Sequence, residues 1–592
     1  MKMLFRGILS AALLAAVVAR PAVAQDSLAI VPGNAPIVVQ LNGYEKAKVR
    51  LGTFLGNSLP DVAPKLVKQM DDSLRDLLDG RELKAVSKDG RVFVAITDLA
   101  SLADEPEFAI IIPVTSVKEF KDGFLKEDER KALKKSGDNI ESVKIDGKEA
   151  TTFFVDRKDH VVLSTNSDVA ALFAKSTDKH LGTVMAKGTQ TAFLAQDVAV
   201  YVNLKMVNKQ YGAQVRGFKA IIDLTLQGGG GMGLDKKQIE MARGLFNSLV
   251  ALFDDGVAAV LGVEFRPEGG NLHFTAQFSS DSETNDFLKK LTPAAFKQLG
   301  AMPNGMMMYS ASNFEMGASK TLTALMQSAL ADDEDEDAKQ GIKAALKDLA
   351  AADRVVQYSG MNTIGSGIEI AEYKDAAKAN AAMLKMFKSL SKSGSFGNVP
   401  LKAAPTIKEN AETVGKFKFT SVKFNYDFDK AVEALPENIR DATRATMERL
   451  AGDKVTLYFG YSGNTLIQIA GKDWAQAKAG IEEYLKGGNP LDKDENFQSV
   501  RKQLPADATM LMLGDTARTL EMIVDLVKDQ AAALPGFPGG GIPELKAPKG
   551  KPAFFGVAVT MKNEYTSFDM FVPVTAIQQV RKMFAPLIDG DN

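Results

Sequence analysis

The sequence predicts an α+β fold made of tandem antiparallel-sheet modules, with the helices on one face of each sheet. Each module is expected to contain a strand, a broken pair of helices, and then two strands followed by a helix. Three observations predict this fold. Apolar strand-like stretches occur in pairs with polar turns between them, an amphipathic helical pattern follows each pair, and the series restarts several times along the 592 residues.

The clearest two copies of the strand–strand–helix pattern lie near the ends of the chain. Residues 90–125 and 552–585 each contain two apolar strands with a polar turn between them. Val117, Phe120 and Phe124 then recur at a spacing that places them on one face of a helix. Both stretches therefore predict the same local structure.

Both copies pass from strand to helix through the triplet Pro-Val-Thr. The threonines of these triplets are Thr115 and Thr575. Because a threonine hydroxyl can accept a hydrogen bond from the first turn of a helix, we expect each of them to be the N-cap.

The strand–strand–helix pattern recurs about six times, in modules that alternate between long and short. This alternation indicates an internal duplication of residues 25–300 in residues 301–592. The predicted domains are a long module at 25–186, a short one at 187–300, a long one at 301–495 and a short one at 496–592.

The first residues, 1–24, are typical of a signal peptide. Lys2 and Arg6 precede a short apolar run, and Ala22-Val23-Ala24 matches a cleavage site. We expect a mature chain beginning at Gln25, exported to the periplasm or the extracellular space; an uncleaved anchor helix is the alternative. No later apolar run is long enough for a transmembrane helix.

Composition excludes several kinds of site. The chain has no cysteine, which excludes disulfides, thiolate nucleophiles and cysteine-based metal sites. Lys and Arg total 72 and Asp and Glu total 74, so the net charge gives no electrostatic reason to bind nucleic acid. We expect no nucleic-acid partner.

Three loops at equivalent helix tips are the candidate binding residues, because binding residues on repeated scaffolds usually lie in loops. The first matches the dinucleotide fingerprint formally, but it follows a helical stretch rather than a strand, so a helix-hairpin tip is the better interpretation. The second is acidic and lacks the EF-hand glycine and glutamate. The candidates are Gly228, Gly230, Gly233, Asp332, Asp333, Asp335, Asp337, Phe537 and Gly540.

No motif identifies a catalytic residue or a cofactor, and a metal site stays undecided. The histidines His160, His180 and His273 show no spacing that would bring two of them together. Methionines such as Met308 and Met512 are expected to fill irregular core space. Residues 492–496 begin like a calcium loop but lack its glycine, which favours a solvated loop.

The exported, cysteine-free layout with its repeated Pro-Val-Thr signature resembles large secreted bacterial proteins of unknown function. The resemblance implies no substrate and no site residues. The sequence therefore favours a non-catalytic binding or scaffolding protein of the bacterial cell envelope, whose partner is an unidentified protein or envelope component. A carboxylate-dependent hydrolase and a carrier of an apolar ligand are the alternatives.

Overall fold

A computed structural model gives the structure of the chain. It describes residues 27–588 except 80, 100–106, 147–149, 176–178, 228–249, 252, 314–335, 364–365, 397–398, 434, 436, 452–454 and 534–550. The predicted signal peptide therefore lies outside the described residues. Among the described helices, none is both long and apolar enough to cross a membrane.

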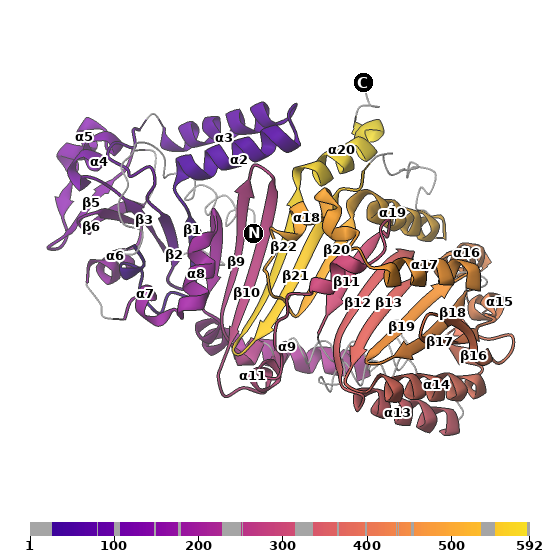
Figure 1. Ribbon diagram of the computed structural model, residues 1–592. Coiled ribbons are helices and arrows are strands. Elements are labelled where there is room, and N and C mark those ends of the chain that lie inside the picture. Colours follow the sequence, from indigo (N-terminus) through magenta and orange to yellow (C-terminus); the bar gives the residue numbers. More distant parts are fainter. Residues whose placement is uncertain are drawn as a thin grey trace. The chain divides into compact units, whose positions relative to one another are not determined.

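The chain divides into two compact units (Figure 1). Unit 1 contains residues 1–228 and 246–286 together with the short segment 564–569, and unit 2 contains the remainder. The segment 564–569 is therefore separated in sequence from the rest of unit 1 by more than a third of the chain.

Unit 1 is built on an antiparallel sheet with the strand order β4-β5-β6-β7-β3-β2-β1-β8-β9-β10. These strands are β1 (Ile37–Leu41), β2 (Val92–Ile96), β3 (Phe108–Pro113), β4 (Lys134–Lys135), β5 (Ile140–Lys144), β6 (Thr151–Asp156), β7 (His160–Ser164), β8 (Val198–Val202), β9 (Gly256–Arg266) and β10 (Gly269–Phe278). The helices are α2 (Tyr44–Ser58), α3 (Ala63–Leu78), α4 (Val117–Phe124), α5 (Glu127–Ala132), α6 (Ser167–Ala174), α7 (Leu181–Val184), α8 (Lys187–Ala195), α9 (Leu204–Gln227) and the first part of α11 (Glu283–Leu288), and a 3-10 turn covers Ser27–Ala29.

The central strands of unit 1 have buried side chains on both faces. On one face Val94 and Ile110 pack against Phe120 of α4. On the other face Phe93 and Ile111 belong to a second cluster that includes residues of α6, α7 and α8. The near-continuous apolar sequences of β2 and β3 are explained by this two-sided burial.

Unit 2 is built on a second antiparallel series, β16-β17-β18-β19-β13-β12-β11-β20-β21. Its strands are β11 (Met308–Ser312), β12 (Arg354–Thr363), β13 (Ser366–Tyr373), β14 (Ser395–Phe396), β15 (Val399–Pro400), β16 (Thr406–Val414), β17 (Phe417–Lys423), β18 (Thr456–Ser462), β19 (Thr465–Gly471), β20 (Met510–Asp515) and β21 (Phe554–Lys562). Its helices are α13 (Glu336–Ala350), α14 (Ala376–Ser393), α15 (Phe428–Val432), α16 (Glu437–Ala451), α17 (Trp474–Lys486), α18 (Glu495–Arg501), α19 (Thr516–Ala533) and α20 (Val574–Ile588), with 3-10 turns at Lys297–Ala301 and Leu491–Lys493.

Strand β22 (Tyr565–Pro573) begins in the part of the chain assigned to unit 1 and ends in unit 2.

In unit 2, the main core contains Tyr309, Tyr358 and Leu511 from the sheet, together with Phe497 of α18. A second cluster lies where α13 and α14, side by side in Figure 1, cover β17, β18 and β19.

The predicted α+β fold is confirmed, because helices and antiparallel strands make up both units. In unit 1, however, helices pack on both faces of the sheet rather than on one. The two units also share a strand order. The series β6-β7-β3-β2-β1-β8-β9 in unit 1 corresponds, strand by strand, to β18-β19-β13-β12-β11-β20-β21 in unit 2. The boundaries of the four predicted modules stay a prediction.

The expected threonine caps are wrong. Ser116 is the N-cap of α4, where its side chain accepts a hydrogen bond from the Glu119 N–H. Thr115 instead donates its hydroxyl to the Ala85 carbonyl. Thr575 already lies inside α20, which begins at Val574. The triplet does mark the change from strand to helix, but its threonine does not cap the helix.

Candidate functional site

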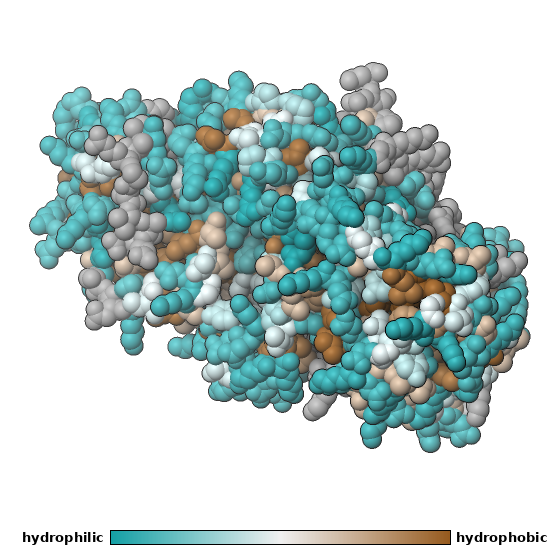
Figure 2. Space-filling model, viewed as in Figure 1, coloured by the Kyte–Doolittle hydropathy of each residue, from teal (hydrophilic) through white to brown (hydrophobic). Residues whose placement is uncertain are grey.

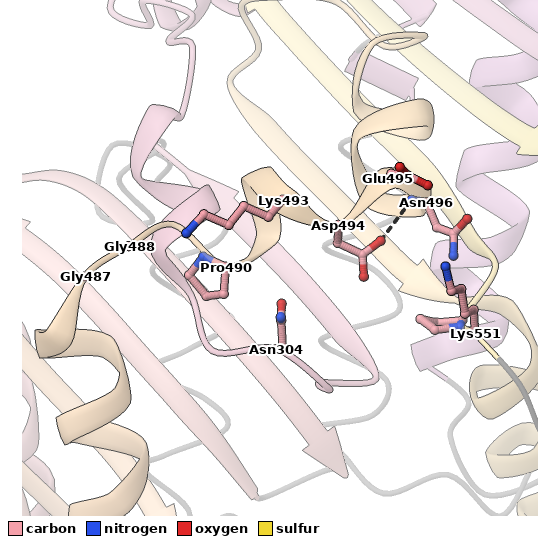
Figure 3. Close-up of a pocket in the computed structure, with 10 residues that line it drawn as sticks. Asn304, Gly487, Gly488, Pro490, Lys493, Asp494, Glu495, Asn496 and Lys551 are labelled. Atoms are coloured by element: carbon pink, nitrogen blue, oxygen red, sulfur yellow. Dashed lines mark hydrogen bonds between the residues drawn. The ribbon is translucent and has the colours of Figure 1, made fainter.

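A polar depression of about 620 Å³ opens on the surface of unit 2 (Figure 3). It forms where the C-terminus of α17 meets the 3-10 turn at Leu491–Lys493 and the start of α18. Its lining residues are Asn304, Gly487, Gly488, Pro490, Lys493, Asp494, Glu495, Asn496, Lys551 and Pro552.

Backbone conformation shapes one rim of the depression. Gly487, Gly488 and Asn489 follow α17 with φ angles of 68°, 95° and 46°. Three consecutive residues in this left-handed region turn the chain sharply, and glycine adopts it at little cost. The Gly487 N–H ends α17 by donating to the Tyr484 carbonyl. For the N–H of Gly488, the described part of the chain supplies no acceptor.

The depression is lined by charges of both signs. Lys493 and Lys551 contribute two ammonium groups, and Asp494 and Glu495 contribute two carboxylates. Asp494 is also the N-cap of α18, where it accepts hydrogen bonds from the N–H groups of Asn496 and Phe497. In Figure 3 the Lys493 side chain reaches toward Pro490, whereas Lys551 lies beside Asn496.

The charged residues other than Asp494 have few protein partners. Within the described residues, neither lysine lies within ion-pair distance of a carboxylate, and Glu495 has no cationic partner. The Asp494 carboxylate already accepts hydrogen bonds from the first turn of α18. The charges available to a ligand are therefore those of Lys493, Lys551 and Glu495.

A second feature of unit 2 is the sheet face opposite the main core, which we call the methionine face. Along β20 and β11, Leu511, Leu513 and Tyr309 are buried, while the alternating Met510, Met512 and Met308 are not. Their register places Met308, Met361, Met510, Met512, Phe555, Val557 and Val559 on this face. None of these side chains belongs to the hydrophobic clusters formed by the described residues.

A row of polar side chains crosses the methionine face. Ser310, Ser359, Glu369 and Gln468 lie opposite one another on successive strands. The hydroxyl oxygens of Ser310 and Ser359 are 2.7 Å apart, and Gln468 Nε2 donates to Glu369 Oε1 at 2.9 Å. Burial raises the pKa of the Glu369 carboxyl, and Arg354 opposes that shift.

In unit 1, a hydrogen-bonded network includes one of the three histidines. His273 Nδ1 lies 2.7 Å from Asp569 Oδ1, and His273 Nε2 lies 2.8 Å from the Thr275 hydroxyl. The order of groups is that of a hydrolase triad. Thr275 is, however, buried, and a nucleophile needs an open space beside it for the substrate. We therefore interpret the network as a structural link between β10 and the segment 564–569.

Most candidate residues from the sequence lie outside the described part of the chain. Gly228, Gly230, Gly233, Asp332, Asp333, Asp335, Phe537 and Gly540 all do so. Asp337 is described and lies exposed in the first turn of α13. The structure brings no two of the candidate loops together within the described residues, and these loops stay predictions.

Sequence reasoning missed the residues of the depression. The expected solvated loop at residues 492–496 is wrong, because Asp494 caps α18 and its neighbours line the depression. The signal for a cap was present, since Asp494 directly precedes a helical pattern.

Among the described residues, no group of three His, Asp or Glu side chains is placed to hold a metal ion.

Surface hydropathy is mixed over unit 2. Figure 2 shows a mostly hydrophilic face with several separate apolar patches, one of which lies between α17 and β19. The apolar surface visible in this view therefore forms small patches rather than one continuous area.

Comparisons with known proteins identify no family. No protein-family model matches the chain, and no curated protein matches it. Two solved structures, of crystal forms I and III of TP0453, show a partial likeness, each with a TM-score of 0.19. Form I is 10% identical and covers 43% of this chain and 80% of its own; form III is 11% identical and covers 45% and 88%. A TM-score this low does not establish a shared fold.

Proposed function

We propose that the protein is an exported, non-catalytic binding protein of the bacterial cell envelope, and that unit 2 binds the acyl chain of an amphipathic molecule on its methionine face. The N-terminal signal pattern supports export. The similar strand order of the two units supports an internal duplication, which would have produced a repeated binding scaffold.

The observation that carries the proposal is the composition of the methionine face. Helices α13 and α14 cover one end of this sheet face, at β17, β18 and β19, whereas the methionines lie on β11, β12 and β20. Where one side of an antiparallel sheet is packed and the other is not, the second side usually has polar side chains. Here the second side carries methionine, valine and phenylalanine, and Met510 is 44% exposed. The other six residues are half-buried, so this face presents apolar surface to a ligand, and the flexible methionine side chain adapts to ligands of varied shape.

The polar row supports an amphipathic ligand rather than a purely apolar one. Ser310, Ser359 and Glu369 offer hydroxyl and carboxyl groups in the middle of the apolar side chains. A polar head group could form hydrogen bonds there, while its acyl chain covers the methionines. Burial raises the pKa of the Glu369 carboxyl, whose Oε1 accepts a hydrogen bond from Gln468, so this polar group lies within the sheet face rather than in bulk solvent.

Binding of a dansyl-labelled fatty acid to the mature chain tests the proposal. Replacing both Met510 and Met512 with Gln keeps side-chain size but adds a polar amide, so we expect affinity to fall at least about tenfold. The control is Val49→Gln, at a 63% exposed position on α2 of unit 1. Equal affinity of the wild type and the double variant, with unchanged circular dichroism, would falsify the proposal.

A further inference from the structure

We propose that the polar depression of unit 2 is a second binding site, for a short peptide with a free ammonium and a free carboxylate group. This site is separate from the methionine face and requires a different ligand. Its assignment therefore does not depend on the proposed function.

Size is the first reason. A volume of about 620 Å³ lies within the usual range of small-molecule pockets. It is large enough for a peptide of a few residues. The exposed backbone at Gly487 and Gly488 carries no side chain that would fill the opening.

Charge is the second reason. Lys493 and Lys551 have no carboxylate partner among the described residues, and Glu495 has no cation. The carboxylates of Asp494 and Glu495 would repel a ligand that carries only negative groups. The two lysines would repel a ligand that carries only positive groups. A zwitterion offers a partner to both sets, because each of its charged ends is opposite in sign to a group that has no partner among the described residues.

Hydrogen bonding is the third reason. Asn304 and Asn496 present amide groups to the depression, and each amide both donates and accepts. The N–H of Gly488 is a further donor that the described protein leaves unused. Peptide groups of the ligand supply the complementary donors and acceptors.

The test measures binding of trialanine, N-acetyl-trialanine and trialanine amide to the mature chain by calorimetry. We expect the free peptide to bind and each capped peptide to bind more weakly. Replacing Lys493 and Lys551 together with Gln is expected to lower affinity for the free peptide about tenfold, with little effect on the amide, which lacks the carboxylate. Glu495→Gln should weaken the free peptide but not the N-acetyl form.

Lys502→Gln is the matched control, because Lys502 is exposed at the end of α18 and does not line the depression. The Lys502→Gln variant should bind trialanine with the affinity of the wild type. The proposal is overturned if trialanine does not bind at millimolar concentration, if the capped peptides bind as tightly as the free one, or if Lys502→Gln weakens binding as much as the double variant does. A loss of fatty-acid binding in the methionine variants would leave these results unchanged.

Discussion

Arg81 and Glu129 show how single residues stabilise unit 1. The Arg81 guanidinium donates to both carboxylate oxygens of Glu129, at 2.6 and 2.8 Å, and their side chains are only 5% and 6% exposed. The N–H groups of Lys126 and Asp146 donate to the same carboxylate. These partners satisfy a buried charge that would otherwise be costly.

The ion pair between Arg81 and Glu129 predicts that the folded protein loses stability in acid. Hydrogen bonding to Arg81 lowers the pKa of Glu129 to about 2. Folding lowers the pKa of this carboxyl from its unfolded value near 4.5. The ionised carboxyl therefore stabilises the protein above pH 4.5, and the protein loses this stability as pH falls toward 2. The contribution at neutral pH is about 3 kcal/mol. Urea denaturation between pH 6 and pH 2.5 measures it, and Glu129→Gln should flatten that pH dependence; an unchanged slope contradicts the assignment.

At the scale of the element, two glycines differ in what surrounds them. A Cβ on Gly367 of β13 would lie 2.3 Å from the Gly360 carbonyl oxygen, a backbone atom of the adjacent strand. A Cβ on Gly56 of α2 would meet nothing within 4 Å. The first glycine is required by close packing of strands, and the second is not.

This difference predicts opposite effects of the same substitution. Gly367→Ala should destabilise the protein by about 1 to 3 kcal/mol, because the adjacent backbone must move. Gly56→Ala should stabilise it by about 0.5 to 1 kcal/mol, since alanine favours the helix. Thermal denaturation of both variants measures the change, and a melting temperature for Gly367→Ala at or above that of the wild type is the contrary outcome.

Elements held by local interactions could be predicted from the sequence. The turn at Gly463-Asn464 forms the hairpin β18–β19, and Asp473 caps α17 with Trp474 packed near Phe419 and Tyr458. The methionine face could not be predicted in this way. It depends on placing β20 beside β11, strands far apart in the sequence, and on one face of that pair staying unburied.

At the scale of the whole molecule, residues 564–569 are part of unit 1 although they lie near the end of the chain. Asp569 contacts His273, which is 296 residues away in sequence. The Glu564 N–H donates to Asn285 Oδ1, and the Glu564 carbonyl accepts from the Phe278 N–H. No local sequence pattern carries information about such distant partners.

A double-mutant cycle measures the strength of this link. His273→Gln and Asp569→Asn should each destabilise unit 1. We expect a coupling free energy of about 1 to 2 kcal/mol, because the two side chains bond to each other and only 14% and 11% of them are exposed. Hydrogen exchange of the β9 and β10 amides reports on unit 1 specifically. Strictly additive effects of the two substitutions would show that the contact contributes nothing.

The position of residues 564–569 also has a consequence for biosynthesis. A ribosome makes the chain from its N-terminus, so most of unit 1 exists long before the residues that complete it. Until then β10 lacks its bond to Asp569, and an incomplete sheet edge can pair with other chains. A premature stop codon near the end of the gene would therefore damage the N-terminal part of the protein as well, and a nascent chain would need protection from aggregation until its last strand was available.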